Sequence, residues 1–175
     1  MFSDPVKNVE QCGIQAGMDI ADFGAGSGFY TIASAKALMA TGRVYAIDAQ
    51  KDLLSKLKNN AARAGLYNVE VIWGDIEKIG GTKLRESSVD LVFLCNVLFQ
   101  LENKGDIVNE IKRILKPAGR ILVVDWSDSF GGIGPQPGHV VKKSVVLEMF
   151  EKGGFHMDRK ISAGSHHYGF IFKKL

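Results

Sequence analysis

A glycine-rich heptapeptide, Asp22 to Gly28 (DFGAGSG), offers the clearest chemistry in this sequence. Glycines at positions 24, 26 and 28 let the backbone turn sharply and approach a ligand without interference from a Cβ atom. A plain glycine turn would use the same residues, so the glycines alone leave both interpretations open. The spacing departs from the G-x-G-x-x-G pattern of dinucleotide-binding loops, because the third glycine comes one residue early and Phe29 stands in its place.

The acidic residue Asp22 lies two residues before the first glycine of this loop. A carboxylate at this place is a poor neighbour for a pyrophosphate, whereas it attracts the ammonium group of an amino acid or a sulfonium group. The electrostatics therefore favour a cationic ligand over a dinucleotide.

Three further polar residues follow apolar runs that resemble strands. Asp48 comes twenty residues after Gly28, where a carboxylate can accept hydrogen bonds from both ribose hydroxyls. Asp75 follows Gly74 and could accept a hydrogen bond from an adenine amino group. Either aspartate could instead cap a following helix. Asn96 follows the fourth apolar run and could either face the same ligand site or serve as a turn residue.

Short apolar runs alternate with amphipathic stretches along the whole chain, which is the pattern of βαβ units around a parallel sheet. The expected strands are residues 18–23, 43–48, 69–73, 89–94 and 120–126. The expected helices are residues 28–39, 51–64, 106–115 and 144–152, with a turn at 116–119 after the third of them. The continuous apolar runs predict strands that are covered on both faces.

Both ends of the chain add to this pattern. Asp4 and Pro5 open a short helix that should end near Gly13. Residues 155–161 and 168–173 are close enough in sequence to form an antiparallel hairpin. We therefore predict one domain over residues 1–175, with 1–17 as a short helical segment. Its fold class is α/β: a Rossmann-like, doubly wound, seven-stranded sheet, mostly parallel with an antiparallel C-terminal hairpin strand and helices on both faces.

Composition narrows the functional classes. The net charge of +3 and the pI of about 8.8 are mildly basic, without the dense basic stripe of most nucleic-acid-binding proteins. Two cysteines, Cys12 and Cys95, exclude a disulfide framework and lack the spacing of metal ligands. No run of eighteen apolar residues and no signal peptide are present, so we expect a cytoplasmic protein.

Taken together, these motifs resemble those of the class I S-adenosylmethionine-dependent methyltransferases, in particular the ubiquinone/menaquinone-biosynthesis-like (methyltransferase type 11) group. The resemblance runs from Met18 to the C-terminus. The matching segments, in order, are DFGAGSGFYT, VYAIDAQKDLLSKL, VEVIWGDIEKI, SVDLVFLCNVLFQL and EIKRILKPAGRILVVDW. The resemblance implies that S-adenosylmethionine is the methyl donor and S-adenosylhomocysteine the product.

By this resemblance, Asp22 and the glycine loop would hold the methionine part of the cofactor. Asp48 would bind the ribose, and Asp75 with Ile76 would flank the adenine. The backbone of Cys95 and Asn96 would lie near the methionine or the acceptor. The complete expected cofactor-binding set is Asp22, Gly24, Ala25, Gly26, Ser27, Gly28, Tyr30, Asp48, Ala49, Asp75, Ile76, Cys95 and Asn96.

The sequence also departs from the pattern of many relatives. Phe99 and Gln100 stand where histidines are common, so no acceptor contact can be carried over to them. Ala118 replaces a common glycine. The segment before Met18 is shorter than the lid of many relatives, which favours a large acceptor or an open cleft.

Histidines are the candidate catalytic residues. If the final hairpin turns at the carboxyl edge of the sheet, it brings residues 165–168 toward His139 and Asp125. We expect His139, with His166 or His167, to contact the acceptor or to take its proton. The alternatives are surface histidines in loops, or a metal site, although their spacing matches no recognised set of ligands.

The acceptor is expected to be a small molecule or a lipid-like metabolite, with a protein side chain or a free amine as the next choice. Nucleic acid is less favoured, because no Asn-Pro-Pro-Tyr type motif follows the fourth strand. Two other classes compete with a methyltransferase. A nicotinamide oxidoreductase is disfavoured by the glycine spacing and by Asp22, whereas a regulatory module that binds S-adenosylmethionine without catalysis would share all of these motifs.

Overall fold

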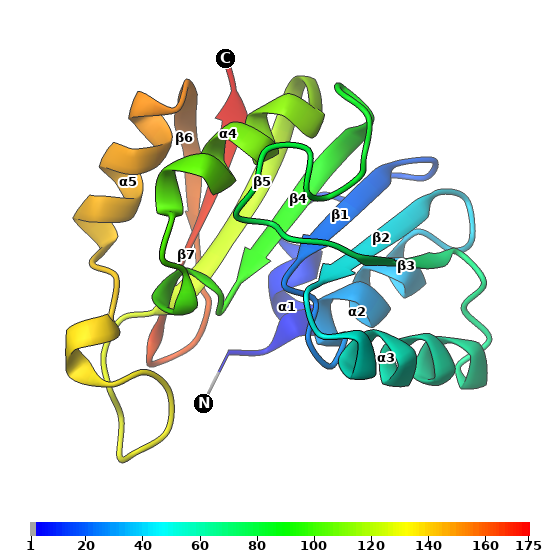
Figure 1. Ribbon diagram of the computed structural model, residues 1–175, viewed down its shortest axis with the longest axis horizontal. Coiled ribbons are helices and arrows are strands. Elements are labelled where there is room, and N and C mark those ends of the chain that lie inside the picture. The colour runs from blue at the N-terminus through cyan, green and yellow to red at the C-terminus, as the bar shows by residue number, and fades with distance from the viewer. Residues whose placement is uncertain (1–2) are drawn as a thin grey trace.

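One sheet of seven strands forms the centre of the computed structural model, which describes residues 3–175 (Figure 1). The strand order is β3-β2-β1-β4-β5-β7-β6. The first five strands run parallel, and β7 runs antiparallel to both of its neighbours. The strands are β1 (Asp19–Phe23), β2 (Arg43–Asp48), β3 (Val69–Trp73), β4 (Val89–Cys95), β5 (Leu115–Trp126), β6 (Phe155–Ile161) and β7 (His167–Lys174). The predicted fold class is confirmed.

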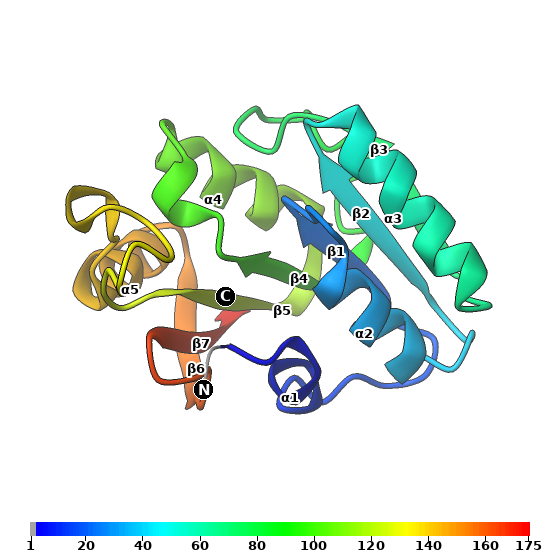
Figure 2. The same ribbon diagram turned by 90° about the horizontal axis from the view of Figure 1, so that it is seen from below.

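Helices cover both faces of this sheet, as Figure 2 shows when the molecule is seen from below. Helices α4 and α5 pack on one face, and α1, α2 and α3 pack on the other. The α-helices are α1 (Pro5–Glu10), α2 (Phe29–Ala37), α3 (Lys51–Arg63), α4 (Lys104–Ile114) and α5 (Lys143–Lys152). Two short 3₁₀ helices, η1 (Leu98–Gln100) and η2 (Pro137–His139), lie in loops.

Strand β4 shows why the sequence has continuous apolar runs. Successive side chains of a strand point to opposite faces. Val92 and Leu94 pack with α4 and α5, while Leu91 and Phe93 pack with α1 and α2, and all four are fully buried. A strand covered on both faces needs apolar residues at every position, and the chain supplies them here.

The expected turn at residues 116–119 is wrong. Helix α4 ends at Ile114, and β5 begins at the next residue and runs on through this segment. Its pairing with β4 shifts there, because Leu115 lies opposite Val89 while Arg120 lies opposite Leu91. Residues 116–119 therefore form a bulge in β5, which accommodates the missing N–H of a proline and a positive φ at position 118.

The C-terminal hairpin turns at the expected edge. Trp126, the last residue of β5, lies opposite His167, the first residue of β7. Residues 162–166 therefore lie beside the carboxyl end of β5, at the edge where the loops after β1 to β4 also lie. Within residues 3–175, no helix is long and apolar enough to cross a membrane.

Candidate active site

The glycine loop between β1 and α2 is held in a conformation that needs glycine. The N–H of Gly24 donates to the carbonyl of Ile47 in the neighbouring strand, at 2.9 Å. Gly24 has a φ of +68°, and a Cβ there would lie 2.7 Å from Cγ2 of Val97. Gly28 has a φ of +84°, and a Cβ there would lie 2.6 Å from Cγ of Leu57. Both positions combine a left-handed backbone with a close neighbour, so any larger side chain would disrupt the loop.

Two adjoining hollows open beside this loop at the carboxyl edge. The first, of about 410 Å³, is lined by the predicted residues Gly24, Gly26, Asp48, Ala49, Asp75, Ile76 and Asn96. The second, of about 480 Å³, is lined by the predicted residues Asp22, Gly24, Ala25, Gly26, Tyr30, Cys95 and Asn96. Because they share Gly24, Gly26, Asn96 and Gln100, we treat them as one cleft, called the glycine cleft below.

Ser27 and Gly28 are the two predicted residues that line neither hollow. The side chain of Ser27 is exposed, and Gly28 is buried against Leu57 at the start of α2. Both residues shape the loop, and the wall of the cleft comes from the three residues before them.

Asp22 is almost fully buried at the floor of the second hollow. Thr31 Oγ1 donates a hydrogen bond of 2.6 Å to its carboxylate. The pKa of Asp22 is raised to about 6, first of all by burial and in small part by the nearby charge of Asp48, against the lowering effect of the Thr31 hydrogen bonds. Cys95 lines the same hollow, and burial raises the pKa of its thiol well above the ordinary value. Asp22 thus offers this hollow an anionic group that ionises near neutral pH.

Asp48 both shapes the glycine loop and lines the cleft. Its Oδ2 accepts a hydrogen bond of 2.9 Å from the N–H of Gly26, and its Oδ1 accepts one of 2.8 Å from the N–H of Gln50. Asp48 does not cap α3, because the N-cap residue is Gln50 and no side chain caps that helix. Each carboxylate oxygen of Asp48 keeps a further lone pair for a hydroxyl donor, so the ligand interpretation remains open.

The loop after β3 brings a second pair of acidic residues to the cleft. Asp75 accepts a hydrogen bond of 3.0 Å from the N–H of Glu77 and lies 3.1 Å from Lys78 Nζ. These contacts, first of all the hydrogen bond from Lys78, lower the pKa of Asp75. Sequence reasoning missed Glu77, which lines the cleft and whose carboxylate accepts from the N–H groups of residues 102 and 103.

Asn96 and Gln100 lie where the two hollows meet. Asn96 has a φ of +58°, and its N–H donates to the carbonyl of Val124 at 2.8 Å. Its side-chain Oδ1 is buried and has no partner within the structure, so it is available to a donor on a ligand. The sequence did not predict Gln100 as a residue of the cleft. Gln100 stands four residues after Asn96, and its Nε2 donates to the Asn96 carbonyl at 3.0 Å.

The N-terminal segment closes one side of the second hollow. Ser3 and Pro5 line it. Tyr30, on α2, accepts a hydrogen bond of 2.8 Å from Nδ2 of the buried Asn8 and so fastens α1 against α2. The hydroxyl of Tyr30 is thus engaged with the protein, while its ring forms part of the wall. No signal in the sequence linked these segments, because Asn8 and Tyr30 are far apart along the chain.

A third hollow, of about 790 Å³, adjoins the glycine cleft and shares Gln100 and Leu101 with it. Phe99, residues 138–142 and Val145 form much of its wall. It is called the outer hollow below. His139, one of the two predicted catalytic residues, lines it.

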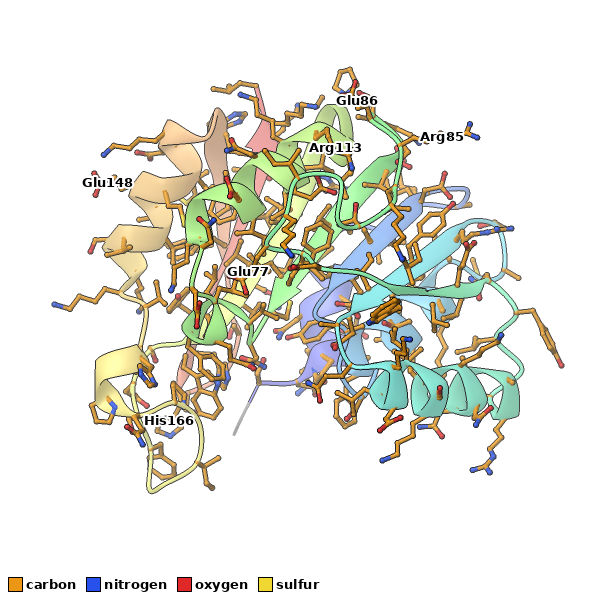
Figure 3. All side chains as sticks on the ribbon, in the orientation of Figure 1. Glu77, Arg85, Glu86, Arg113, Glu148 and His166 are labelled. Carbon is orange, nitrogen blue, oxygen red and sulfur yellow. The ribbon has the colours of Figure 1, made fainter. Side chains whose placement is uncertain are left out.

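His166, the other predicted catalytic residue, lies elsewhere on the same edge. Its Nδ1 lies 2.9 Å from Oδ1 of Asp128, and its ring stacks on Phe130 at 4.1 Å between centroids. Figure 3 shows His166 at the end of the molecule opposite Arg113 and Glu86. It lines none of the three hollows, so the structure does not bring it together with His139 there.

His167 is buried and packs against Trp126 with its ring tilted, at 4.3 Å between the ring centroids. Neither of its ring nitrogens has a hydrogen-bond partner among residues 3–175, and burial lowers the pKa of His167. In the part of the chain that the structure describes, no three His, Cys, Asp or Glu side chains are grouped as a metal site would require. The hypothesis of an imidazole metal site therefore gains no support.

Comparison with known proteins identifies the family to which this fold belongs. A family model described as a methyltransferase domain matches residues 14–155, which is most of the chain. This chain is a class I S-adenosylmethionine-dependent methyltransferase. The predicted resemblance is confirmed.

Relatives of this methyltransferase include enzymes of quinone biosynthesis. It is 24% identical to a demethylmenaquinone methyltransferase of Listeria monocytogenes over 92% of this chain and 81% of the relative. It is 30% identical to the Staphylococcus aureus enzyme of the same name over 68% of this chain, and it spans about half (47%) of that relative's length. A crystal structure of a methyltransferase from Aquifex aeolicus superposes with a TM-score of 0.89 at 29% identity, covering 99% of this chain and 91% of the other.

The residues of the glycine cleft fit the cofactor of this methyltransferase family. At Gly24, which lines the cleft, the absence of a Cβ lets the glycine loop pack directly against the side chain of Val97. The cleft also offers the buried, unpartnered oxygen of Asn96 and the carboxylates of Asp22 and Asp48. These acceptor groups suit the amino, hydroxyl and sulfonium groups of S-adenosylmethionine.

Proposed function

We propose that this methyltransferase transfers the methyl group of S-adenosylmethionine to a small-molecule or lipid-like acceptor held in the outer hollow. The observation that carries the proposal is the shared wall of Gln100 and Leu101, which places the outer hollow directly beside the glycine cleft. The apolar side chains of Phe99, Val141 and Val145 suit an acceptor with an apolar body. Relatives that are named for demethylmenaquinone support an acceptor of this kind.

Each part of the cleft takes one part of the cofactor in this proposal. Asp48 accepts from the ribose hydroxyls, and Asp75 with Ile76 borders the adenine. Asp22, the backbone of residues 24–26 and Asn96 surround the methionine part. When bound, S-adenosylmethionine supplies a methyl group on a positively charged sulfur.

The protein's own contribution is mainly alignment. Methyl transfer needs the acceptor atom, the methyl carbon and the sulfur in line, and it needs water kept away. The walls of the outer hollow orient the acceptor toward the shared boundary at Gln100. A general base is needed only for an acceptor that arrives protonated. His139 is the side chain of the outer hollow that we assign to this role, whereas His166 is engaged with Asp128.

Calorimetric titration tests the cofactor part of the proposal. S-adenosylmethionine and S-adenosylhomocysteine should bind, NADH should not, and Asp48→Ala should weaken both adenosyl ligands. Preferential binding of NADH would contradict the assignment of the cleft.

Transfer of a labelled methyl group tests the acceptor part. We expect label from S-adenosylmethionine to enter a member of a panel of quinols, phenols and amphipathic amines, and not a protein extract. Val145→Trp should fill the outer hollow and abolish transfer while leaving the Kd for S-adenosylhomocysteine unchanged.

With a protonated acceptor, His139→Ala should slow transfer at neutral pH, and unchanged turnover would remove the proton-transfer role. If the protein bound S-adenosylmethionine but transferred its methyl group to no class of acceptor, the result would favour a regulatory module that binds the cofactor without catalysis.

A further inference from the structure

The loop between β3 and β4, residues 74–88, contributes Asp75, Ile76 and Glu77 to the glycine cleft. The loop contains no helix or strand, so its shape must come from contacts with other elements. It is fastened to α4, on the face of the sheet that α4 and α5 cover.

A buried carboxylate on α4 makes that attachment. The side chain of Glu110 is fully buried. Its Oε2 accepts a hydrogen bond of 2.7 Å from the N–H of Gly80, and its Oε1 accepts one from the hydroxyl of the fully buried Thr82. Arg113, one turn further along α4, donates to both oxygens of Glu110 at 2.8 Å and to the carbonyl of Leu84 at 2.8 Å.

The loop segment that Glu110 holds lies directly against a residue of the cleft. The N–H of Asp75 donates to the carbonyl of Gly81, at 3.2 Å. Gly81 approaches so closely that a Cβ on it would overlap the carbonyl oxygen of Asp75. A displacement of residues 80–82 must therefore displace Asp75, because these two segments of the loop leave no space between them.

Glu110 is ionised at neutral pH. Burial alone would raise its pKa, but hydrogen bonds from Arg113, Thr82 and Gly80 lower it to about 2. A glutamine at this position would replace one carboxylate oxygen by an NH2 group. That donor would face other donors, such as Arg113 or the N–H of Gly80, and would find no acceptor there.

We propose that Glu110 is a positioning residue for the cofactor: through Gly80, Thr82 and Gly81 it fixes Asp75 and its neighbours at the adenine side of the glycine cleft. Nothing in the sequence motif assigned Glu110 this role, and it does not line the cleft itself. The inference rests on the proposed cofactor contacts of Asp75 and Ile76.

A matched pair of substitutions at Thr82 tests the proposal. Thr82→Val keeps the shape of the side chain and removes the hydroxyl that Glu110 holds, whereas Thr82→Ser keeps the hydroxyl. We expect Thr82→Val and Glu110→Gln to raise the Kd for S-adenosylhomocysteine about tenfold, and Thr82→Ser to change it less than about twofold. Hydrogen exchange should become faster in residues 74–88 in the first two variants only.

Asp90→Asn is the control for a general loss of stability. Asp90 accepts from the N–H of Asp19 and pairs with Lys116 at 2.8 Å, so its loss should also lower the Tm. It lies at the start of β4, away from the carboxyl edge, and should leave the Kd unchanged.

An unchanged Kd in both Glu110→Gln and Thr82→Val, with a Tm lowered as in the control, would overturn the proposal and leave Glu110 a purely structural residue. If Glu110→Gln fails to fold, the comparison of the Kd values of Thr82→Val and Thr82→Ser is sufficient to test the proposal. Failure of the unsubstituted protein to bind S-adenosylhomocysteine would overturn the proposed function as well, which separates the two failures.

Discussion

Burial brings the pKa of the Asp22 carboxyl group close to neutral pH. Its pKa of about 6 follows from burial first, and the charge of Asp48 acts in the same direction. In the proposed complex it lies at the methionine end of the cleft. Of the two adenosyl ligands, only S-adenosylmethionine carries a sulfonium charge, so Asp22 should distinguish them according to pH.

The first prediction concerns this distinction. Above about pH 6 Asp22 is ionised and attracts the sulfonium, and below that pH the attraction is lost. The ratio of the Kd for S-adenosylmethionine to that for S-adenosylhomocysteine should therefore rise as the pH falls from about 7.5 to about 5.5. Calorimetry at several pH values measures the ratio, and Asp22→Asn should make it independent of pH. A constant ratio in the unsubstituted protein would contradict the assignment.

A second prediction separates close approach from backbone strain at glycine. Gly24 and Gly65 both have a positive φ, but only Gly24 has a neighbour where a Cβ would be. Gly65→Ala should cost about 1 kcal/mol of stability and leave cofactor binding unchanged. Gly24→Ala should cost more, because Val97 must move, and should abolish binding of S-adenosylhomocysteine. Urea unfolding measures the stability of both variants. If Gly24→Ala and Gly65→Ala changed stability and binding by equal amounts, backbone strain alone would account for the glycine at position 24.

At the scale of elements, α4 does more than cover the sheet. Glu110 and Arg113 tie it to the loop after β3, and Glu77 in that loop holds the backbone just before α4 begins. These contacts join elements that are adjacent in space but separated along the chain by β4. The stability of the fold should therefore depend on the charge of Glu110.

The third prediction gives the sign of that dependence. The folded state lowers the pKa of Glu110 from 4.5 to about 2, so the stabilisation is present above about pH 4.5 and is lost as the pH falls toward 2. The full effect is about 3 kcal/mol. The difference in free energy of unfolding between the unsubstituted protein and Glu110→Gln, measured with urea, should be larger at pH 7 than at pH 3. A difference that did not vary with pH would contradict it.

The sequence predicted most elements because their local patterns agree with the fold. Residues 116–119 were mistaken for a turn, since Pro117 and Gly119 are local turn signals while strand pairing with distant β4 overrides them. Asp48 and Asp75 were predicted to lie at this edge because Asp48 ends β2 and Asp75 comes two residues after β3. Gln100 and Ser3 were missed, because only the folded chain brings them to the cleft.

The histidines show the same limit. The sequence placed the hairpin turn at the correct edge of the sheet, which strand order determines. The direction of each ring depends on its neighbours, and Asp128 with Phe130 holds His166 away from the hollows. Side-chain direction in loops is a tertiary property that spacing along the chain does not encode.

On the scale of the whole molecule, the sheet ends at an exposed edge strand, β6 (Figure 1). Its residues 156–160 are exposed and include Asp158, Arg159 and Lys160, and its pairing with β7 is irregular between Met157 and Arg159. Charges and a bulge on an edge strand discourage pairing with a second sheet.

The fourth prediction follows from this edge. Replacing Asp158, Arg159 and Lys160 together by valine should leave the fold of the chain intact but cause added association that increases with protein concentration. Light scattering would measure the association, and circular dichroism would check the fold. The charge-conserving substitutions Asp158→Glu, Arg159→Lys and Lys160→Arg, made together, serve as the control. A valine variant that associated no more than the unsubstituted protein would contradict the role of these charges.

The glycine cleft draws its walls from residues up to Leu101, and the outer hollow draws its walls from Phe99 onward. If the proposed function holds, donor binding and acceptor choice are thus encoded by successive parts of the gene. A recombination crossover near Gln100 would exchange one acceptor preference for another and leave the donor half whole. Under the role inferred for it, Glu110 is the residue that the incoming half would have to retain.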